Sequence, residues 1–162
     1  MRFEFVADKR TKVKTLLKSH DVSKGLLAKI KYKGGNILVN GIEQNAIYLL
    51  DIGDVVTIDI PKEEPFEKLE AIPFDLDIVY EDNHFLVINK PVGFASIPSA
   101  IHSNTIANFI KAYYVKKNYP NQQVHIVTRL DRDTSGLMLF AKHGYAHARL
   151  DKQLQTRAIE KR

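Results

Sequence analysis

The sequence predicts an α+β fold in which antiparallel sheets carry a few short helices. Apolar and polar residues alternate over several short segments, which is typical of strands with one buried face. Turn dipeptides such as Asn40-Gly41 and Asp82-Asn83 join these segments, and they indicate hairpins rather than helical crossovers. The expected strands outnumber the expected helices. A doubly wound parallel sheet is therefore disfavoured.

The first 61 residues are expected to contain two helices and several strands. Ser23 is a good N-cap for the second helix because its hydroxyl can accept a hydrogen bond from the first turn. Gly34-Gly35 then ends that helix, since glycine adopts the left-handed conformation without strain. Gly53-Asp54 marks a further turn. The expected elements are, in order, a strand at 2–6, helices at 12–20 and 24–33, and strands at 37–39 and 55–60.

Charge is distributed unevenly along the chain. Nine basic residues and a single acidic one lie within residues 9–33, whereas eight acidic residues lie within residues 63–82. The basic segment is either a solvated helix face or a surface for a polyanion, to which each Lys or Arg adds salt-sensitive affinity. The acidic segment is rich in proline and lacks periodicity, which predicts a linker at 62–76.

The composition excludes several classes of function. The chain has no cysteine, which rules out disulfides, a Cys-based zinc site and thiol catalysis. Its apolar runs are far shorter than the roughly 20 residues of a membrane span. His143 and His147 have the spacing of a metal pair but lack a nearby third ligand. We therefore expect a cytoplasmic protein with no metal and no membrane contact. We also expect it to be a monomer.

Residues 77–162 are expected to form a second segment of strands and helices. Ser103 or Asn104 is the expected N-cap of a helix whose apolar side includes Ile106, Phe109, Ile110 and Tyr113. A polar loop is expected at 131–136. The other expected elements are strands at 77–81, 84–89 and 126–130, a buried strand at 137–141, and a helix at 144–155 with Leu150 and Leu154 inward.

The polar loop carries the most reactive combination of side chains. Asp131 is adjacent to Arg129 and Arg132, whose positive charge is expected to keep the carboxylate ionised. Such a carboxylate can act as a nucleophile or general base beside a phosphate-binding cation. The alternative is a structural Asp–Arg pair that holds the turn together.

Two other catalytic patterns fit this loop less well. A phosphatase of the haloacid-dehalogenase type also spaces two aspartates as Asp-x-Asp, but Arg129 interrupts the apolar strand that such an enzyme requires. An aspartic protease needs Asp-Thr-Gly or Asp-Ser-Gly, whereas one extra residue stands in Asp133-Thr134-Ser135-Gly136.

Two motifs and one domain resemble a known family. Arg-Leu-Asp-Arg-Asp-Thr-Ser-Gly-Leu-Met-Leu-Phe-Ala-Lys at 129–142 resembles the catalytic motif of the RluA-type RNA pseudouridine synthases. Asn89-Lys90-Pro91-x-Gly93 is similar to their second motif. Residues 12–60 resemble the S-four-like RNA-binding module, often N-terminal in that family. The resemblance implies a small α/β RNA-binding domain at 1–61, the linker at 62–76, and the N-terminal part of a mainly antiparallel catalytic domain at 77–162.

The resemblance also implies an activity, an isomerisation of uridine to pseudouridine in structured rRNA or tRNA without a cofactor. Asp131 would act on the ribose, either by attacking C1′ or by removing a sugar proton. Arg129 would help extrude the uridine, and Arg132 and Thr134 would also contact the RNA. The RNA-binding face of the N-terminal domain would consist of Lys12, Lys14, Ser23, Lys24, Lys29 and Lys31. The competing reading is a non-catalytic RNA-binding protein that acts in ribosome assembly.

The family motif continues with a tyrosine that packs on the uracil, followed by further strands. Here the chain ends at Arg162. We therefore expect an incomplete catalytic domain that has little activity alone and binds RNA through residues 9–33.

Overall fold

The computed structural model describes residues 1–63 and 69–156 of the chain. The chain divides into two compact units, unit 1 (Met1–Lys62) and unit 2 (Glu63–Arg162). Both combine helices with antiparallel sheets, which confirms the predicted α+β composition. Across the described ranges, every helix is too short or too polar to cross a lipid bilayer.

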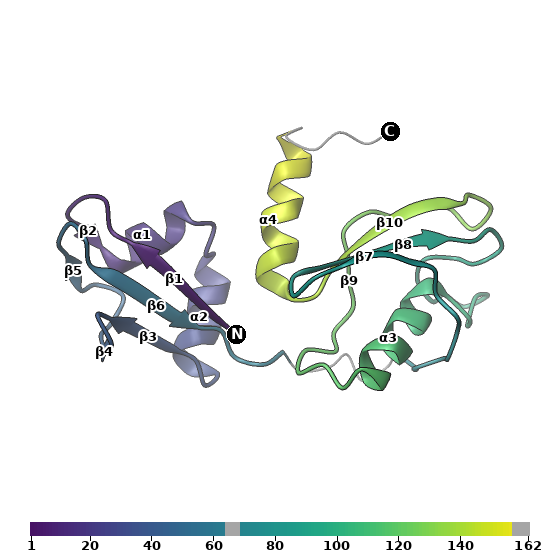
Figure 1. Ribbon diagram of the computed structural model, residues 1–162, viewed down its shortest axis with the longest axis horizontal. Helices are drawn as coiled ribbons and strands as arrows, with labels where there is room; N and C mark the ends of the chain where they lie inside the picture. Colours follow the sequence, from purple (N-terminus) through teal and green to yellow (C-terminus); the bar gives the residue numbers. More distant parts are fainter. Residues whose placement is uncertain (64–68, 157–162) are drawn as a thin grey trace. The chain divides into compact units, whose positions relative to one another are not determined.

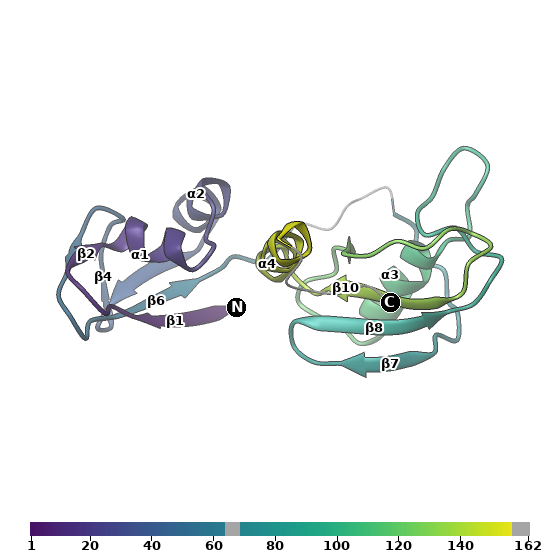
Figure 2. The ribbon, with the colours of Figure 1, turned by 90° about the horizontal axis from the view of Figure 1, so that it is seen from above.

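Unit 1 contains a four-stranded antiparallel sheet, a two-stranded ribbon and two helices. Its strands are β1 (Arg2–Val6), β2 (Thr11–Lys12), β3 (Asn36–Val39), β4 (Ile42–Glu43), β5 (Leu49–Leu50) and β6 (Val55–Asp59). Its helices are α1 (Val13–Ser19) and α2 (Lys24–Tyr32). The larger sheet has the order β1-β6-β3-β4, and β2 pairs with β5. Both helices lie on one side of the larger sheet (Figures 1 and 2).

The turn Asn40-Gly41 joins β3 to β4 as predicted. Both residues have positive φ, 50° and 83°, a conformation that Asn and Gly tolerate. The Asn40 side chain accepts a hydrogen bond from the Val55 N–H at 3.0 Å and donates one to Asp54 Oδ1 at 3.0 Å. This side chain therefore fastens the hairpin to β6, its neighbour in the sheet.

Helix α2 begins at the predicted cap. Ser23 Oγ accepts a hydrogen bond from the Leu26 N–H at 3.0 Å. Gly34, with φ of 97°, turns the chain away from the helix. At Gly35 a Cβ atom would lie 2.3 Å from the carbonyl oxygen of Asp59, so only glycine lets β3 enter the sheet so close to α2.

Unit 2 contains a second four-stranded antiparallel sheet and two helices. Its strands are β7 (Ile78–Glu81), β8 (Phe85–Lys90), β9 (His125–Ile126) and β10 (Gly136–Ala141). Its helices are α3 (Ile106–Lys116) and α4 (Gly144–Gln155). The strand order is β7-β8-β10-β9. The core lies between this sheet and α3 and consists of Leu86, Ile88, Ile106, Phe109, Ile110, Tyr114, Met138 and Phe140.

Three sequence predictions within unit 2 need correction. The N-cap of α3 is Thr105, not Ser103 or Asn104, because Thr105 forms a capping box with Asn108. The strand 137–141 is not buried throughout, since side chains alternate along β10 and Leu137 is 60% exposed.

The third correction concerns the strand expected at 126–130. Pairing of β9 with β10 ends at Ile126. Beyond it, the N–H groups of Val127 and Thr128 both point to the carbonyl oxygen of Leu139, at 2.9 and 3.3 Å. Thr128 Oγ1 also accepts from the Leu139 N–H at 3.0 Å, so a side chain replaces the next ladder bond. The strand therefore ends early and a loop begins.

The segment expected as a linker contacts unit 2 over its described part. The Phe74 ring stacks on Phe109 with centroids 4.3 Å apart. The Ile72 N–H donates to the Asn108 carbonyl oxygen at 3.1 Å, and the Asn108 amide donates to the carbonyl oxygen of Glu70 at 2.9 Å. Residues 70–74 are thus bound to α3, while residues 64–68 of the expected linker lie outside the described residues.

Candidate active site

The loop between β9 and β10, residues 127–135, presents the predicted catalytic residue to solvent; we call it the Asp131 loop. The structure brings four predicted site residues together on it, all exposed: Arg129, Asp131, Arg132 and Thr134. The Thr134 N–H donates to the carbonyl oxygen of Asp131 at 3.0 Å, which closes a tight turn directly after the carboxylate.

Lys90, the last residue of β8, is fully buried against the backbone of this loop. Its Nζ lies 3.1 Å from the carbonyl oxygen of Asp131, 3.2 Å from that of Arg132 and 2.8 Å from that of Thr134. The carbonyl oxygen of Pro91 lies at 3.1 Å. A buried ammonium group requires acceptors for its hydrogens, and here the backbone of the loop supplies them. The turn that carries Asp131 is thereby fixed to the end of β8.

Two further hydrogen bonds hold the loop. The Gly93 N–H donates to the carbonyl oxygen of Arg132 at 2.8 Å. The buried Ser96 hydroxyl donates to the carbonyl oxygen of Leu130 at 2.7 Å. Together with Lys90, these groups show that residues 90–96 form the support on which the Asp131 turn rests.

The strand register explains why the two motifs meet. Residue Lys90 at the end of β8 pairs with Gly136 at the start of β10. The motif at 89–93 therefore continues from one strand end, and the Asp131 loop enters the neighbouring strand at the same edge. The two motifs begin 40 residues apart in the chain but form one site. The motif at 129–142 carries the Asp131 carboxylate, and the motif at 89–93 holds the backbone of the Asp131 loop.

Over the residues it describes, the structure does not show the Asp–Arg pair that was the structural alternative for Asp131. Arg132 forms an ion pair of 3.9 Å with Asp133, and both side chains are exposed. Among the ion pairs of residues 1–63 and 69–156, none joins Asp131 to an arginine. Burial lowers the pKa of Lys90, while the negative charges of Asp133 and Asp131 oppose that shift. The turn is held by a lysine, and the Asp131 carboxylate remains available to a substrate.

Sequence reasoning missed Lys90 and Ser96 as site residues. A signal for Lys90 was present, because Leu86, Ile88 and Lys90 share one face of β8 at period two and all three are buried. A lysine at an inward-facing position of a strand indicates a buried ammonium group that is paired with hydrogen-bond acceptors. Ser96 lies in an irregular segment whose sequence gives no comparable sign.

The predicted RNA face of unit 1 is exposed. Its lysines come from β2, α1 and α2: Lys12, Lys14, Lys24, Lys29 and Lys31. The sixth member, Ser23, uses its hydroxyl as the cap of α2. The face therefore offers five cations on neighbouring elements, and Ser23 has a structural role there.

The histidines near α4 contact other side chains. His143 Nδ1 accepts from the Ala146 N–H at 3.2 Å, and its Nε2 lies 2.9 Å from His84 Nδ1. His147 Nδ1 lies 3.3 Å from His125 Nδ1. No set of three or more suitable side chains in the described parts of the chain is arranged to hold a metal ion.

Comparison with known proteins defines the class of unit 2. Residues 84–162 match the family model described as RNA pseudouridylate synthase. The match includes β8, the Asp131 loop and every group that holds it. The C-terminal part of this chain is therefore similar to RNA pseudouridine synthase domains.

Three curated relatives illustrate the similarity. The uncharacterized RNA pseudouridine synthase YjbO of Bacillus subtilis is 45% identical over 142 residues, which cover 87% of this chain and 50% of YjbO. YlyB of the same organism is 38% identical, covering 80% of this chain and 44% of its own length. The ribosomal large subunit pseudouridine synthase D of Pseudomonas aeruginosa is 37% identical, covering 80% and 40%. The chain spans about half the length of the curated relatives it matches.

Proposed function

We propose that this protein isomerises uridine to pseudouridine in structured RNA and that Asp131 is its catalytic residue. The observation that carries the proposal is the buried Lys90 ammonium, which binds the backbone of the Asp131 turn and leaves the carboxylate exposed. A group that acts on a sugar must be held in a fixed position while remaining accessible. The YjbO alignment is longer than unit 2, so the similarity extends into unit 1 as well.

The reaction requires one bond exchange and no redox partner. The bond between N1 of uracil and C1′ of ribose breaks, the uracil rotates, and C5 bonds to C1′. The hydrogen of C5 is released and N1 gains one. Asp131 acts at the ribose, either as a nucleophile at C1′ or as a base toward a sugar proton.

Exposed cations on the same loop fit the handling of a flipped nucleotide. Arg129 is exposed two residues before Asp131, where its planar guanidinium can occupy the stack that the uridine leaves. Arg132 and Thr134 lie on the other side of Asp131 in the chain and supply contacts to the RNA backbone. Extrusion of the base costs a few kcal/mol, which these contacts help to offset.

Unit 1 serves in this proposal as an S-four-like RNA-binding domain. Its five exposed lysines lie on two helices and the adjoining strand, and Asp21 is the one acidic residue among positions 9–33. Lysines of this kind contact phosphates and recognise RNA by shape. The name of the Pseudomonas relative refers to the large ribosomal subunit, so large-subunit rRNA is the proposed substrate and tRNA the second choice.

Release of tritium from RNA tests this function. Unmodified large-subunit rRNA transcribed with 5-tritiated uridine loses its label wherever C5 becomes bonded to C1′. Because this chain covers 50% of YjbO and is expected to have little activity alone, the assay uses a full-length protein, which here means a form as long as such relatives. That protein is expected to release tritium equivalent to a small whole number of uridines per molecule and then stop. Binding of the RNA without any release would contradict the enzyme and favour the non-catalytic assembly factor.

A further inference from the structure

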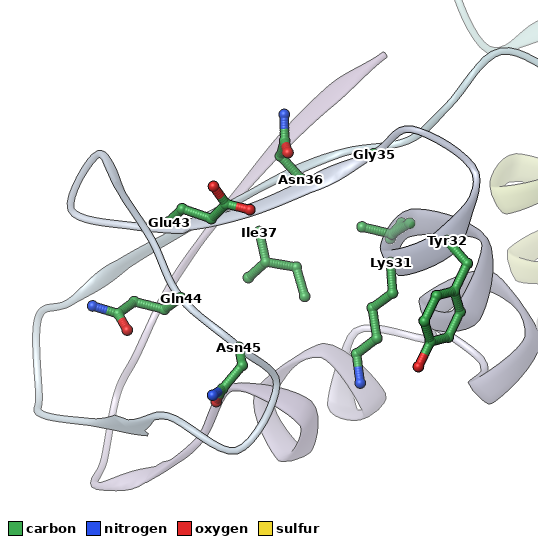
Figure 3. Close-up of a pocket in the computed structure, with 9 residues that line it drawn as sticks. Lys31, Tyr32, Gly35, Asn36, Ile37, Glu43, Gln44 and Asn45 are labelled. Carbon is green, nitrogen blue, oxygen red and sulfur yellow. The ribbon is translucent and has the colours of Figure 1, made fainter.

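Unit 1 contains a cleft of about 540 Å³ at the end of α2, and no residue of the Asp131 loop lines it. Its walls come from the last turn of α2, from the start of β3 and from the chain around β4, as Figure 3 shows. A volume of this order is sufficient for a small ligand. The side chains that matter for its chemistry are Lys31, Tyr32, Asn36, Glu43, Gln44 and Asn45.

Tyr32 provides an exposed aromatic surface at this cleft. Its side chain is 81% exposed, more than that of any other aromatic residue in the described chain, while Ile30 in the same helix is fully buried. Packing of α2 therefore does not depend on Tyr32. An exposed ring beside a basic segment is a surface on which a nucleobase can stack.

The opposite wall carries hydrogen-bonding groups. Figure 3 shows Lys31 and Tyr32 leaving α2 in the same direction, with the backbone of Gln44 and Asn45 on the other side of the cleft and the Gln44 side chain pointing away from α2. Asn45 Oδ1 accepts a hydrogen bond from the Ile47 N–H at 3.2 Å, which fixes the position of that amide. Amide side chains donate and accept hydrogen bonds, as the edge of an unpaired base requires.

The charges give the ligand an orientation. Lys31 is the cation of the cleft, and Glu43 lies on another wall beside Asn36. A phosphate is attracted to the ammonium and repelled by the carboxylate, whereas a carboxylate can accept hydrogen bonds from the N–H groups of a base. The phosphate is thus expected near Lys31 and the base edge near Glu43.

We propose that this cleft binds one unpaired nucleotide of RNA, with the base stacked on Tyr32 and a phosphate at Lys31. The inference rests on the proposed RNA-binding role of unit 1 and deepens it. The exposed lysines of the helices recognise phosphates in any conformation, whereas this cleft requires a base that is free of its partner. Unit 1 would therefore select RNA that has a single-stranded nucleotide beside a structured region.

The absence of tryptophan from the chain permits a direct test of stacking. Tyr32→Trp places a single indole in the cleft, and Tyr80→Trp places one at a 53% exposed position in unit 2. A short single-stranded oligoribonucleotide is expected to quench the Tyr32→Trp fluorescence by at least half at saturation, and the same sequence in a duplex is not. The Tyr80→Trp signal is expected to change by less than a tenth. Equal quenching by duplex and single strand would overturn the proposal.

Affinity measurements on the full chain separate this inference from the proposed function. Tyr32→Leu is expected to weaken binding of the single-stranded oligonucleotide roughly tenfold, the effect of losing one base–aromatic stack. Lys31→Gln is expected to reduce the salt slope of that binding by about 0.7, and Lys62→Gln, with the same charge change at an exposed position outside residues 9–33, to leave it unchanged. If the unaltered chain binds no RNA, the proposed role of unit 1 fails. If it binds RNA and Tyr32→Leu changes the affinity less than twofold, only the cleft assignment fails.

Discussion

The ammonium group of Lys90 lies 3.1 Å from the backbone carbonyl oxygen of Asp131. Lys90 is the end of an inner strand of the sheet and Asp131 the middle of a loop, so this contact fixes the loop to the end of β8. The lysine binds the backbone and not the carboxylate. The backbone carbonyl oxygen of Asp131 therefore holds the loop in place, and its side-chain carboxylate is left for the proposed chemistry.

Replacement of Lys90 is expected to destabilise unit 2. Lys90→Met removes the charged donor of three carbonyl oxygens. Those of Asp131 and Arg132 keep the N–H groups of Thr134 and Gly93, whereas that of Thr134 loses its bond of 2.8 Å. Hydrogen bonds to charged groups contribute about 1.5–3 kcal/mol. We expect the free energy of unfolding to fall by about 3 kcal/mol, measured by urea denaturation. Lys116→Met, an exposed control on α3, is expected to change it by less than about 0.5 kcal/mol. An unaltered urea midpoint for Lys90→Met would contradict the role of this contact.

The Glu81–Lys142 ion pair is also expected to stabilise unit 2. Burial alone would raise the pKa of Glu81, but hydrogen bonds from Lys142, Tyr113 and Tyr119 outweigh burial and lower it. Lys142 is 12% exposed and lies 2.7 Å from the Glu81 carboxylate. Glu81→Gln is expected to cost about 2 kcal/mol at pH 7, since it leaves this ammonium without its anion.

The pH dependence of the Glu81 variant provides the control. A carboxyl group whose pKa is lowered by folding stabilises the protein above its unfolded pKa, and this contribution is lost as pH falls through the folded value. The difference between Glu81→Gln and the unaltered chain should therefore shrink between pH 5 and pH 3. Glu70→Gln, at an exposed position, should show no such convergence.

His143 is expected to make unit 2 less stable in mild acid. Burial lowers the pKa of His143 to about 4. The unfolded chain therefore binds a proton that the folded chain does not, and stability falls as pH decreases from 6.5 toward 4. We expect about 2 kcal/mol of this loss between pH 7 and pH 5.

His143→Asn isolates that contribution. Asn is a good N-cap and replaces the acceptor that His143 Nδ1 offers to the Ala146 N–H, but it does not titrate. Chemical denaturation at pH 7 and pH 5 should show a clearly smaller loss for this variant than for the unaltered chain. Identical losses in the two proteins would refute the assignment.

The lysines of unit 1 are expected to control the salt dependence of binding to structured RNA. Lys14→Gln with Lys29→Gln removes two phosphate contacts, which should reduce the slope of log K against log salt by about 2. Lys116→Gln with Lys117→Gln removes the same charge from the C-terminal end of α3 and its cap in unit 2. If both double variants lower the slope equally, the RNA face is not confined to unit 1.

Local chemistry made much of the fold predictable. The Asn40-Gly41 turn and the Ser23 cap follow from the residues at those positions and their immediate neighbours. The cap of α3 was missed because Ser103, Asn104 and Thr105 are chemically equivalent candidates. Asn108 selects Thr105, and the Asn108 amide is itself held by the backbone of Glu70.

Contacts distant in sequence account for the rest. The early end of β9 depends on Leu139, which meets both Val127 and Thr128. The reactive loop was found from its own residues, but its support was not, since Lys90 and Ser96 act through backbone atoms more than 30 residues away. A sequence motif identifies the group that does the chemistry more readily than the group that positions it.

The most direct test compares Asp131→Asn with Asp133→Asn in the full-length protein. Both changes remove one negative charge from an exposed position of the same loop. The two variants should therefore be equally stable, and their affinities for RNA should agree within twofold. Tritium release from 5-tritiated uridine in large-subunit rRNA is expected to be abolished by Asp131→Asn and retained by Asp133→Asn. Retained release with Asp131→Asn, at unchanged RNA binding, would contradict the assignment of Asp131 as the catalytic residue.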